Sequence, residues 1–216
     1  MKGLDQAAGR YRKISRFAEG MARGKMKGDP VYRRILPHLE GAHNLLDLGC
    51  GEGYLLSLVR THAPQVQLHG IDHDGARLDL ARLVLEGEPN VTLVEQNLQS
   101  AELPGADVIS CLDVLHYLVP ERQDQVIQRM CAALTENGVL VIREGISDGG
   151  WRTTLTRASE HLARVMGRHK GDGIYFRPKT ALGEVLEENG MQVLLEPCSE
   201  GTPFANLLWT ARKAAP

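Results

Sequence analysis

From Asn44 onward, short apolar runs alternate with amphipathic stretches, and this alternation limits the fold more than any other feature of the 216-residue chain. Five runs are long enough for buried strands, at residues 44–48, 66–71, 91–95, 108–111 and 139–142. Helical periodicity separates them near residues 53–61, 75–86 and 123–134. Strands that are separated by helices need crossover connections, which predicts a parallel, doubly wound α/β sheet.

The rhythm changes after the fifth strand. Residues 151–167 have the spacing of an amphipathic helix, and a helix over 180–188 follows. Residues 191–196 and 204–211 are typical of two closing strands, and the link between them is too short for a parallel crossover. We therefore predict a seven-stranded, mostly parallel sheet with a terminal antiparallel strand pair.

No repeat, low-complexity tract or linker divides the chain, so we expect one domain, 41–216, preceded by a helical extension, 1–40. In the extension, Asp29 as N-cap and Pro30 at the first helical position predict a helix that ends near Leu39. Glycines 24 and 28 interrupt the helix before it, whose apolar positions are Tyr11, Ile14, Phe17, Ala18 and Met21.

The charge is unevenly distributed. The formal net charge is −2, yet residues 1–30 carry eight Lys or Arg against three Asp or Glu. A second basic stretch runs from Arg152 to Lys170. The overall balance excludes a global basic field for nucleic acid or membrane, so any such binding is local.

The four cysteines lie far apart in the sequence, at positions 50, 111, 131 and 198. They lack the close spacing of zinc sites and small disulfide frameworks, so we predict no metal and a reducing compartment. No apolar run suits a signal peptide or a membrane span. We expect a cytoplasmic protein.

The first strand leads into the segment Leu45–Gly53, LLDLGCGEG, in which three glycines alternate before a helix. Glycine lets the backbone approach a ligand closely. The dehydrogenase fingerprint Gly-x-Gly-x-x-Gly would need glycine at position 54, where Tyr54 stands, and the lysine of a phosphate-binding P-loop is missing. The second strand ends in Asp72, an acid that suits the ribose of any adenosine cofactor.

The pattern of a strand acid followed by Gly-x-Gly-x-Gly resembles the first motif of the class I S-adenosylmethionine-dependent methyltransferases, and the resemblance covers residues 44 to about 145. It implies a Rossmann-like methyltransferase fold and S-adenosylmethionine as cofactor. It also implies a set of cofactor-binding positions, with the methionine part over the glycines: Asp47, Gly49, Cys50, Gly51, Gly53, Asp72, His73, Asn97, Leu98 and Leu112.

Candidate catalytic residues follow the fourth and fifth strands, whose carboxyl ends form the ligand-binding edge of such sheets. The resemblance implies that the segment with His116 and Tyr117 follows the methionine end of the cofactor toward the acceptor. Glu144 ends the fifth strand. A base is needed only for a protonated acceptor, such as a phenol or alcohol. Packing of His116 under the substrate loop and a solvated strand end for Glu144 are the alternatives. Arg143 is the candidate for an acidic substrate.

The acceptor is expected to be small or carrier-bound, because both basic segments are candidate covers for the substrate mouth and would attract an acidic carrier protein. Residues 17–30 and Arg143-Glu144 also resemble the small methyltransferases of bacterial aryl polyene pigment synthesis, which implies a hydroxyaryl or polyene acceptor. The alternatives are an RNA methyltransferase, an NAD-dependent oxidoreductase and a noncatalytic cofactor-binding module. The small number of aromatic residues argues against an RNA methyltransferase. The oligomeric state stays open.

Overall fold

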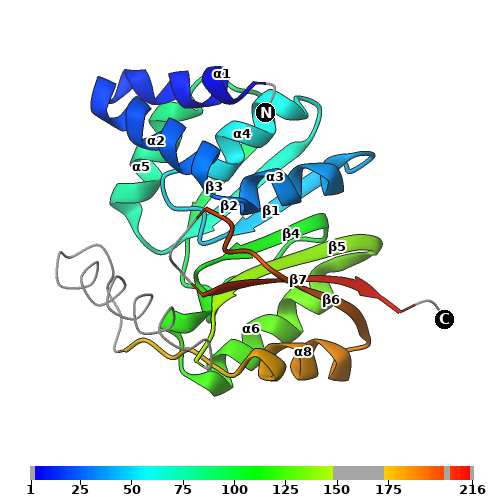
Figure 1. The fold of residues 1–216 in the computed structure, drawn as a ribbon. Helices are drawn as coiled ribbons and strands as arrows, with labels where there is room; N and C mark the ends of the chain where they lie inside the picture. The colour runs from blue at the N-terminus through cyan, green and yellow to red at the C-terminus, as the bar shows by residue number, and fades with distance from the viewer. Residues whose placement is uncertain (1–2, 148–172, 202–204, 215–216) are drawn as a thin grey trace.

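The computed structural model describes residues 3–147, 173–201 and 205–214. Seven strands form one sheet in the order β3-β2-β1-β4-β5-β7-β6 (Figure 1). The strands are β1 (Asn44–Leu48), β2 (Gln67–Asp72), β3 (Val91–Glu95), β4 (Ala106–Leu112), β5 (Leu134–Gly145), β6 (Met191–Pro197) and β7 (Asn206–Lys213). Strands β1 to β5 pair in parallel, while β7 is antiparallel to both β5 and β6. The predicted fold class is confirmed.

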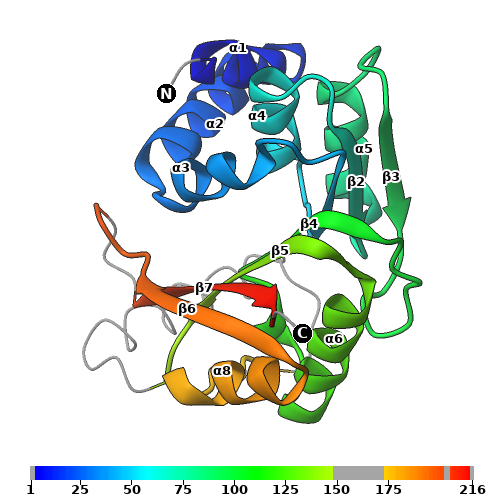
Figure 2. The same ribbon diagram turned by 90° about the vertical axis from the view of Figure 1, so that its right-hand side faces the viewer.

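Helices cover both faces of this sheet, as Figure 2 shows. One face carries α1 (Leu4–Gly9), α2 (Arg16–Gly28), α3 (Val31–Ile35), α4 (Tyr54–His62) and α5 (Gly75–Val84). The other face carries α6 (Pro120–Ala133) and α8 (Lys179–Glu188). Short 3-10 helices, η1 (Arg10–Lys13), η2 (Leu36–Leu39) and η3 (Leu115–Tyr117), complete the described elements. The predicted helix over 151–167 and the second basic stretch lie outside the described residues.

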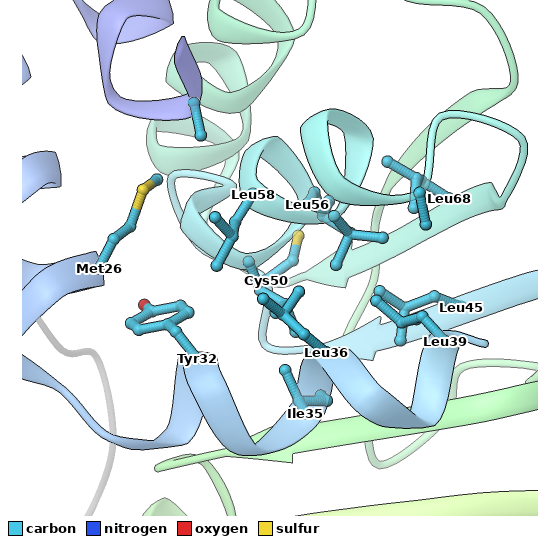
Figure 3. Packing of buried hydrophobic residues seen from close by; sticks show 14 of the residues in the cluster. Met26, Tyr32, Ile35, Leu36, Leu39, Leu45, Cys50, Leu56, Leu58 and Leu68 are labelled. Carbon is cyan, nitrogen blue, oxygen red and sulfur yellow. The ribbon is translucent and has the colours of Figure 1, made fainter. Parts of the chain in front are cut away.

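Successive strand residues point to opposite faces, so each central strand contributes to two separate cores. Leu45 packs with the N-terminal helices, α4 and α5, whereas Leu46 packs with α6 and α8. Figure 3 shows the first core, where Ile35, Leu36 and Leu39 meet side chains of α4 and β1. Residues 1–40 thus contribute to the same core as the sheet.

The N-terminal helices differ from the prediction. The helical structure is interrupted at Ser15, which is the N-cap of α2. The Ser15 hydroxyl accepts a hydrogen bond from the Ala18 N–H at 3.0 Å, and α2 then continues through Gly24 to Gly28. The buried face of α2 is formed by Ala22 and Met26, and the predicted inward residues Phe17 and Met21 are 78% and 52% exposed. The predicted face was wrong at Phe17 and Met21, because α2 starts after Ser15 and packs on α1 and α4, whereas Tyr11 is buried and Ile14 and Ala18 pack against the core.

A buried cation fixes the two segments that lead into β2 and β3. The side chain of Arg60 in α4 is 2% exposed, and its guanidinium donates to backbone carbonyls of both segments. Those carbonyls belong to Pro64, Val66, Pro89 and Asn90.

We expect Arg60→Met to lower the free energy of unfolding by roughly 2–4 kcal/mol, because several buried carbonyls lose their donor. Urea unfolding measures the loss. Arg82→Met is the control, since Arg82 is exposed on α5 and pairs only with Asp79 of its own helix, and it should change stability by less than about 1 kcal/mol. Equal losses in the two variants would contradict the structural role of Arg60.

Candidate active site

The loop between β1 and α4 is shaped by its glycines. Gly49 has φ of +75° and Gly53 has φ of +77°, a backbone conformation that side chains with a Cβ rarely adopt. A Cβ at Gly49 would also clash with the side chain of Val114. The Gly49 N–H donates to the Ile71 carbonyl at 2.7 Å, which joins the loop to the end of β2.

Asp72 lies against this loop at the end of β2. Its carboxylate accepts the Gly51 N–H at 2.7 Å and the Asp74 N–H at 2.9 Å, and the residue is only 4% exposed. The neighbouring His73 is exposed, with Nδ1 3.6 Å from Asp72 Oδ1. The structure therefore brings the predicted ribose acid and the glycine loop together at one edge of the sheet.

Asp47 points inward from β1 beneath the same loop. The residue is 3% exposed, and its Oδ1 accepts the Ser110 hydroxyl at 2.7 Å. Burial raises the pKa of Asp47 to about 7, the Ser110 hydrogen bond opposes this shift, and the nearby charge of Asp72 adds to it. Desolvation is the dominant cause, so a cationic group brought to this carboxylate would favour its charged form.

The remaining predicted cofactor positions lie after β3, at the end of β4 and in the glycine loop. Asn97 is exposed after β3, and its side-chain oxygen accepts the Gln99 N–H at 2.9 Å. Leu98 is buried, and Leu112 at the end of β4 is partly buried. Cys50 is buried, and burial raises the pKa of its thiol, so it packs as a neutral side chain.

The ends of β4 and β5 bring together two of the three predicted catalytic residues. Glu144 Oε2 lies 2.5 Å from His116 Nδ1, and both side chains are 3% exposed. Glu144 Oε1 accepts the N–H groups of Val114 at 2.8 Å and Leu115 at 2.6 Å. This set of donors fixes the carboxylate, and the carboxylate fixes the imidazole ring.

Aromatic rings stand against the imidazole. The Tyr117 ring centroid lies 4.1 Å from that of His116, and the Phe176 centroid lies 5.0 Å away. The Tyr175 N–H donates to the His116 carbonyl at 2.7 Å, which holds the Phe176 segment in place. Tyr117 therefore lies beside the imidazole and not in the hydrogen-bonded pair.

Arg143 is placed at the same edge and is already paired. Its guanidinium binds the carboxylates of Asp113 and Asp29, with Nε 3.0 Å from Asp113 Oδ1. The residue is 4% exposed, and these two carboxylates raise its pKa against the opposing effect of burial. This arrangement gives Arg143 a structural partner on the N-terminal extension. Its predicted contact with an acidic substrate stays a prediction.

Sequence reasoning missed Asp29 and Asp113 as members of this edge. Asp113 has φ of +58°, one of two non-glycine residues with positive φ among the described residues, and its N–H donates to the Arg143 carbonyl at 2.9 Å. The only available signal was the acid that follows β4, because nothing local indicates a pairing across 114 residues with Asp29.

A cavity of about 560 Å³ lies at the opposite, amino edge of the sheet, lined by residues that include His38, Asp107 and Arg212. The cavity lies before the first residue of β1, whereas the glycine loop follows the last residue of β1. Ligands of doubly wound sheets bind at the carboxyl edge, so the candidate active site is the edge formed by the glycine loop, Asp72 and Glu144.

Known proteins resemble this chain in sequence and in fold. Residues 46–140 match the family model for a methyltransferase domain. A carboxy-S-adenosyl-L-methionine synthase from Aliivibrio salmonicida is 26% identical over 106 residues, covering 47% of this chain and 44% of that protein. A trans-aconitate 2-methyltransferase from Afipia carboxidovorans is 31% identical over 108 residues, covering 50% and 40%. The matched part of the chain spans less than half the length of either relative.

Among solved structures, an O-methyltransferase family protein from Burkholderia thailandensis superposes with a TM-score of 0.71 at 23% identity. The match covers 93% of this chain and 60% of that protein. Residues 46–140 therefore resemble a methyltransferase domain, which supports S-adenosylmethionine as the cofactor. This match favours S-adenosylmethionine among the adenosine cofactors that Asp72 alone leaves open.

The buried carboxyl of Asp47 gives a prediction about stability. Its pKa of about 7 in the folded chain exceeds the ordinary value of the unfolded chain, so only the unfolded chain loses this proton between about pH 4 and pH 7. The wild type is therefore destabilised as pH rises through this window, and the effect levels off above it. Asp47→Asn removes the proton exchange.

We expect the stability of Asp47→Asn, relative to the wild type, to increase by about 2–4 kcal/mol from pH 4 to pH 8. Urea unfolding at a series of pH values without cofactor measures this difference. Asp79→Asn, on the exposed face of α5, is the control and should give a nearly constant difference. A constant difference for Asp47→Asn would show that burial does not hold the Asp47 proton.

Proposed function

We propose that this chain is an S-adenosylmethionine-dependent methyltransferase that methylates a hydroxyl group, and that the buried pair of His116 and Glu144 is the observation that carries the assignment. The cofactor fits the part of the sheet edge that is formed by the carboxyl ends of β1 and β2. Glycine backbone at 49–53 allows close approach, Asp72 suits the ribose, and the buried carboxyl of Asp47 suits a cationic amino group. Asn97 and Leu98 follow β3 and are assigned to the adenine.

The chemical roles follow from the hydrogen bonds. S-Adenosylmethionine supplies a methyl group that its sulfonium already activates, so the chain needs to align the acceptor, exclude water and accept a proton. With Nδ1 directed at Glu144, the imidazole of His116 takes the hydroxyl proton at Nε2. Glu144 is a positioning residue, because its carboxylate orients the ring and stabilises the imidazolium that forms.

The surroundings of His116 favour a hydroxyaryl acceptor. Tyr117 and Phe176 present ring faces next to the imidazole, and an aromatic acceptor can stack there with its hydroxyl toward Nε2. Because the His116 side chain is 3% exposed, proton transfer occurs in a site from which water is largely excluded. The N-terminal extension closes this edge through the Asp29–Arg143 pair.

The acidity of the acceptor tests the role of His116. With 4-hydroxybenzoic acid at pH 8, His116→Gln should lower kcat by about 10²–10⁴-fold, because the phenol keeps its proton until a base removes it. With 4-hydroxy-3-nitrobenzoic acid, whose phenol is ionised at this pH, the same variant should lose less than about tenfold. Transfer of a labelled methyl group measures both rates.

Tyr117→Phe is the matched control, because it keeps the aromatic ring beside His116 and should keep most of the rate with both acids. Equal losses for His116→Gln with the two acids would exclude the proton-transfer role. Cofactor binding without transfer to either acid would support the noncatalytic alternative.

A carrier-bound acceptor is supported by the outer face of α2. Phe17 and Met21 are 78% and 52% exposed on one side of this helix. Arg16 and Lys27 flank them, are exposed, and have no ion pair within the part of the chain that the structure describes. An apolar strip between unpaired cations complements an acidic partner with an apolar groove, and we propose that an acidic acyl carrier protein binds there.

Charge reversal on α2 tests the carrier. Arg16→Glu should raise KM for a hydroxyaryl group on an acidic carrier by about tenfold, while KM for the same acceptor as a free acid stays unchanged. Arg122→Glu, on α6 across the sheet, is the matched control and should leave both KM values unchanged. If Arg16→Glu leaves the carrier KM unchanged, the α2 face is not the docking surface.

A further inference from the structure

Lys25 is an exposed residue of α2 and lies above the first turn of α4. Its Nζ is 5.5 Å from the ring centroid of Tyr54, the residue that begins α4 directly after the glycine loop. The Tyr54 hydroxyl donates to Glu52 Oε2 at 2.7 Å, which fixes the ring under the ammonium. The ammonium of Lys25 is therefore held close to the glycine loop.

Four charged side chains lie close enough to Lys25 to affect its pKa, namely Asp113, Asp29, Arg143 and Arg77. Asp113, Asp29 and Arg143 form the ion-paired cluster at the ends of β4 and β5. Arg77 lies at the other side, where a Cβ on Gly51 would be 3.0 Å from its Nη2. Lys25 thus lies beside Tyr54, near both the ion-paired cluster and Arg77.

Of the three cations near this loop, Lys25 is the one with no carboxylate partner in the described part of the chain. Arg143 pairs with Asp29 and Asp113. Arg77 has Glu52, with Nε 3.9 Å from Oε1. No carboxylate oxygen among the described residues lies within 4.0 Å of Lys25 Nζ. Lys25 is exposed, and an ammonium without a carboxylate partner is suited to bind an anionic ligand group.

We propose that Lys25 binds the α-carboxylate of the methionine part of S-adenosylmethionine. This inference rests on the proposed cofactor site, in which the methionine part lies over the glycine loop. That part is a zwitterion, and Asp47 is the nearby acid suited to its amino group, so its carboxylate needs a separate cation. Lys25 supplies that cation from the N-terminal extension, which makes α2 part of the cofactor site.

The experiment compares two sulfonium ligands that differ only in this carboxylate, S-adenosylmethionine and decarboxylated S-adenosylmethionine. Isothermal titration calorimetry measures the dissociation constant of each for the full chain and for Lys25→Gln. We expect Lys25→Gln to weaken S-adenosylmethionine binding by about 10–100-fold and binding of the decarboxylated ligand by less than about twofold, because only the first ligand loses a charge-assisted hydrogen bond.

Arg33→Gln is the control, because it removes one positive charge from the exposed surface of α3 and should leave both dissociation constants unchanged. Equal weakening of the two ligands by Lys25→Gln, or none, would overturn the assignment, and so would selective weakening by Arg77→Gln instead. Thermal unfolding without ligand shows whether each variant folds. A wild type that binds neither ligand would contradict the cofactor site itself, whereas binding without carboxylate selectivity would contradict only the role of Lys25.

Discussion

The guanidinium of Arg143 is the interaction on which the geometry of the carboxyl edge depends. A cation that is 4% exposed needs carboxylate partners, and the chain supplies them from two distant segments, Asp29 after α2 and Asp113 after β4. Asp113 adopts a left-handed backbone to reach it. The pair with Asp29 fixes the end of α2 against the strand ends, and Lys25, one helical turn before Asp29, is held over the glycine loop for the same reason.

Asp47 and Glu144 are buried carboxyls of the same sheet edge, and their environments separate their roles. Glu144 accepts hydrogen bonds from two backbone N–H groups and lies 2.5 Å from the His116 ring nitrogen, so its geometry is fixed. Asp47 has the Ser110 hydroxyl, and burial raises its pKa to about 7. The first environment suits a carboxylate that orients a base, and the second suits one that becomes charged when a cationic ligand arrives.

Much of the fold could be predicted because the relevant signals are local. The strands over 44–48 and 91–95 have the predicted bounds, and the short link after β6 correctly required an antiparallel pair. The helix before Asp29 was misread because Ser15, a local N-cap, was not weighed against the apolar spacing of Phe17 and Met21. The partners of Arg143 lie 30 and 114 residues away in the sequence, and no local pattern encodes such pairs.

The two proposals about α2 are connected, because one helix carries both Lys25 beside Tyr54 and the exposed side chains of Phe17 and Met21. A carrier that binds Phe17, as proposed, would contact the same helix that carries Lys25. Thermodynamic linkage would then require any coupling between carrier and cofactor to change the two affinities by the same factor. Glycines at 20 and 24 lie between these side chains on α2, and each costs about 1 kcal/mol of helix stability relative to alanine. Both proposed binding events would therefore involve a helix whose own stability is low and whose placement depends on its contacts with α1 and α4 and on the Asp29–Arg143 pair.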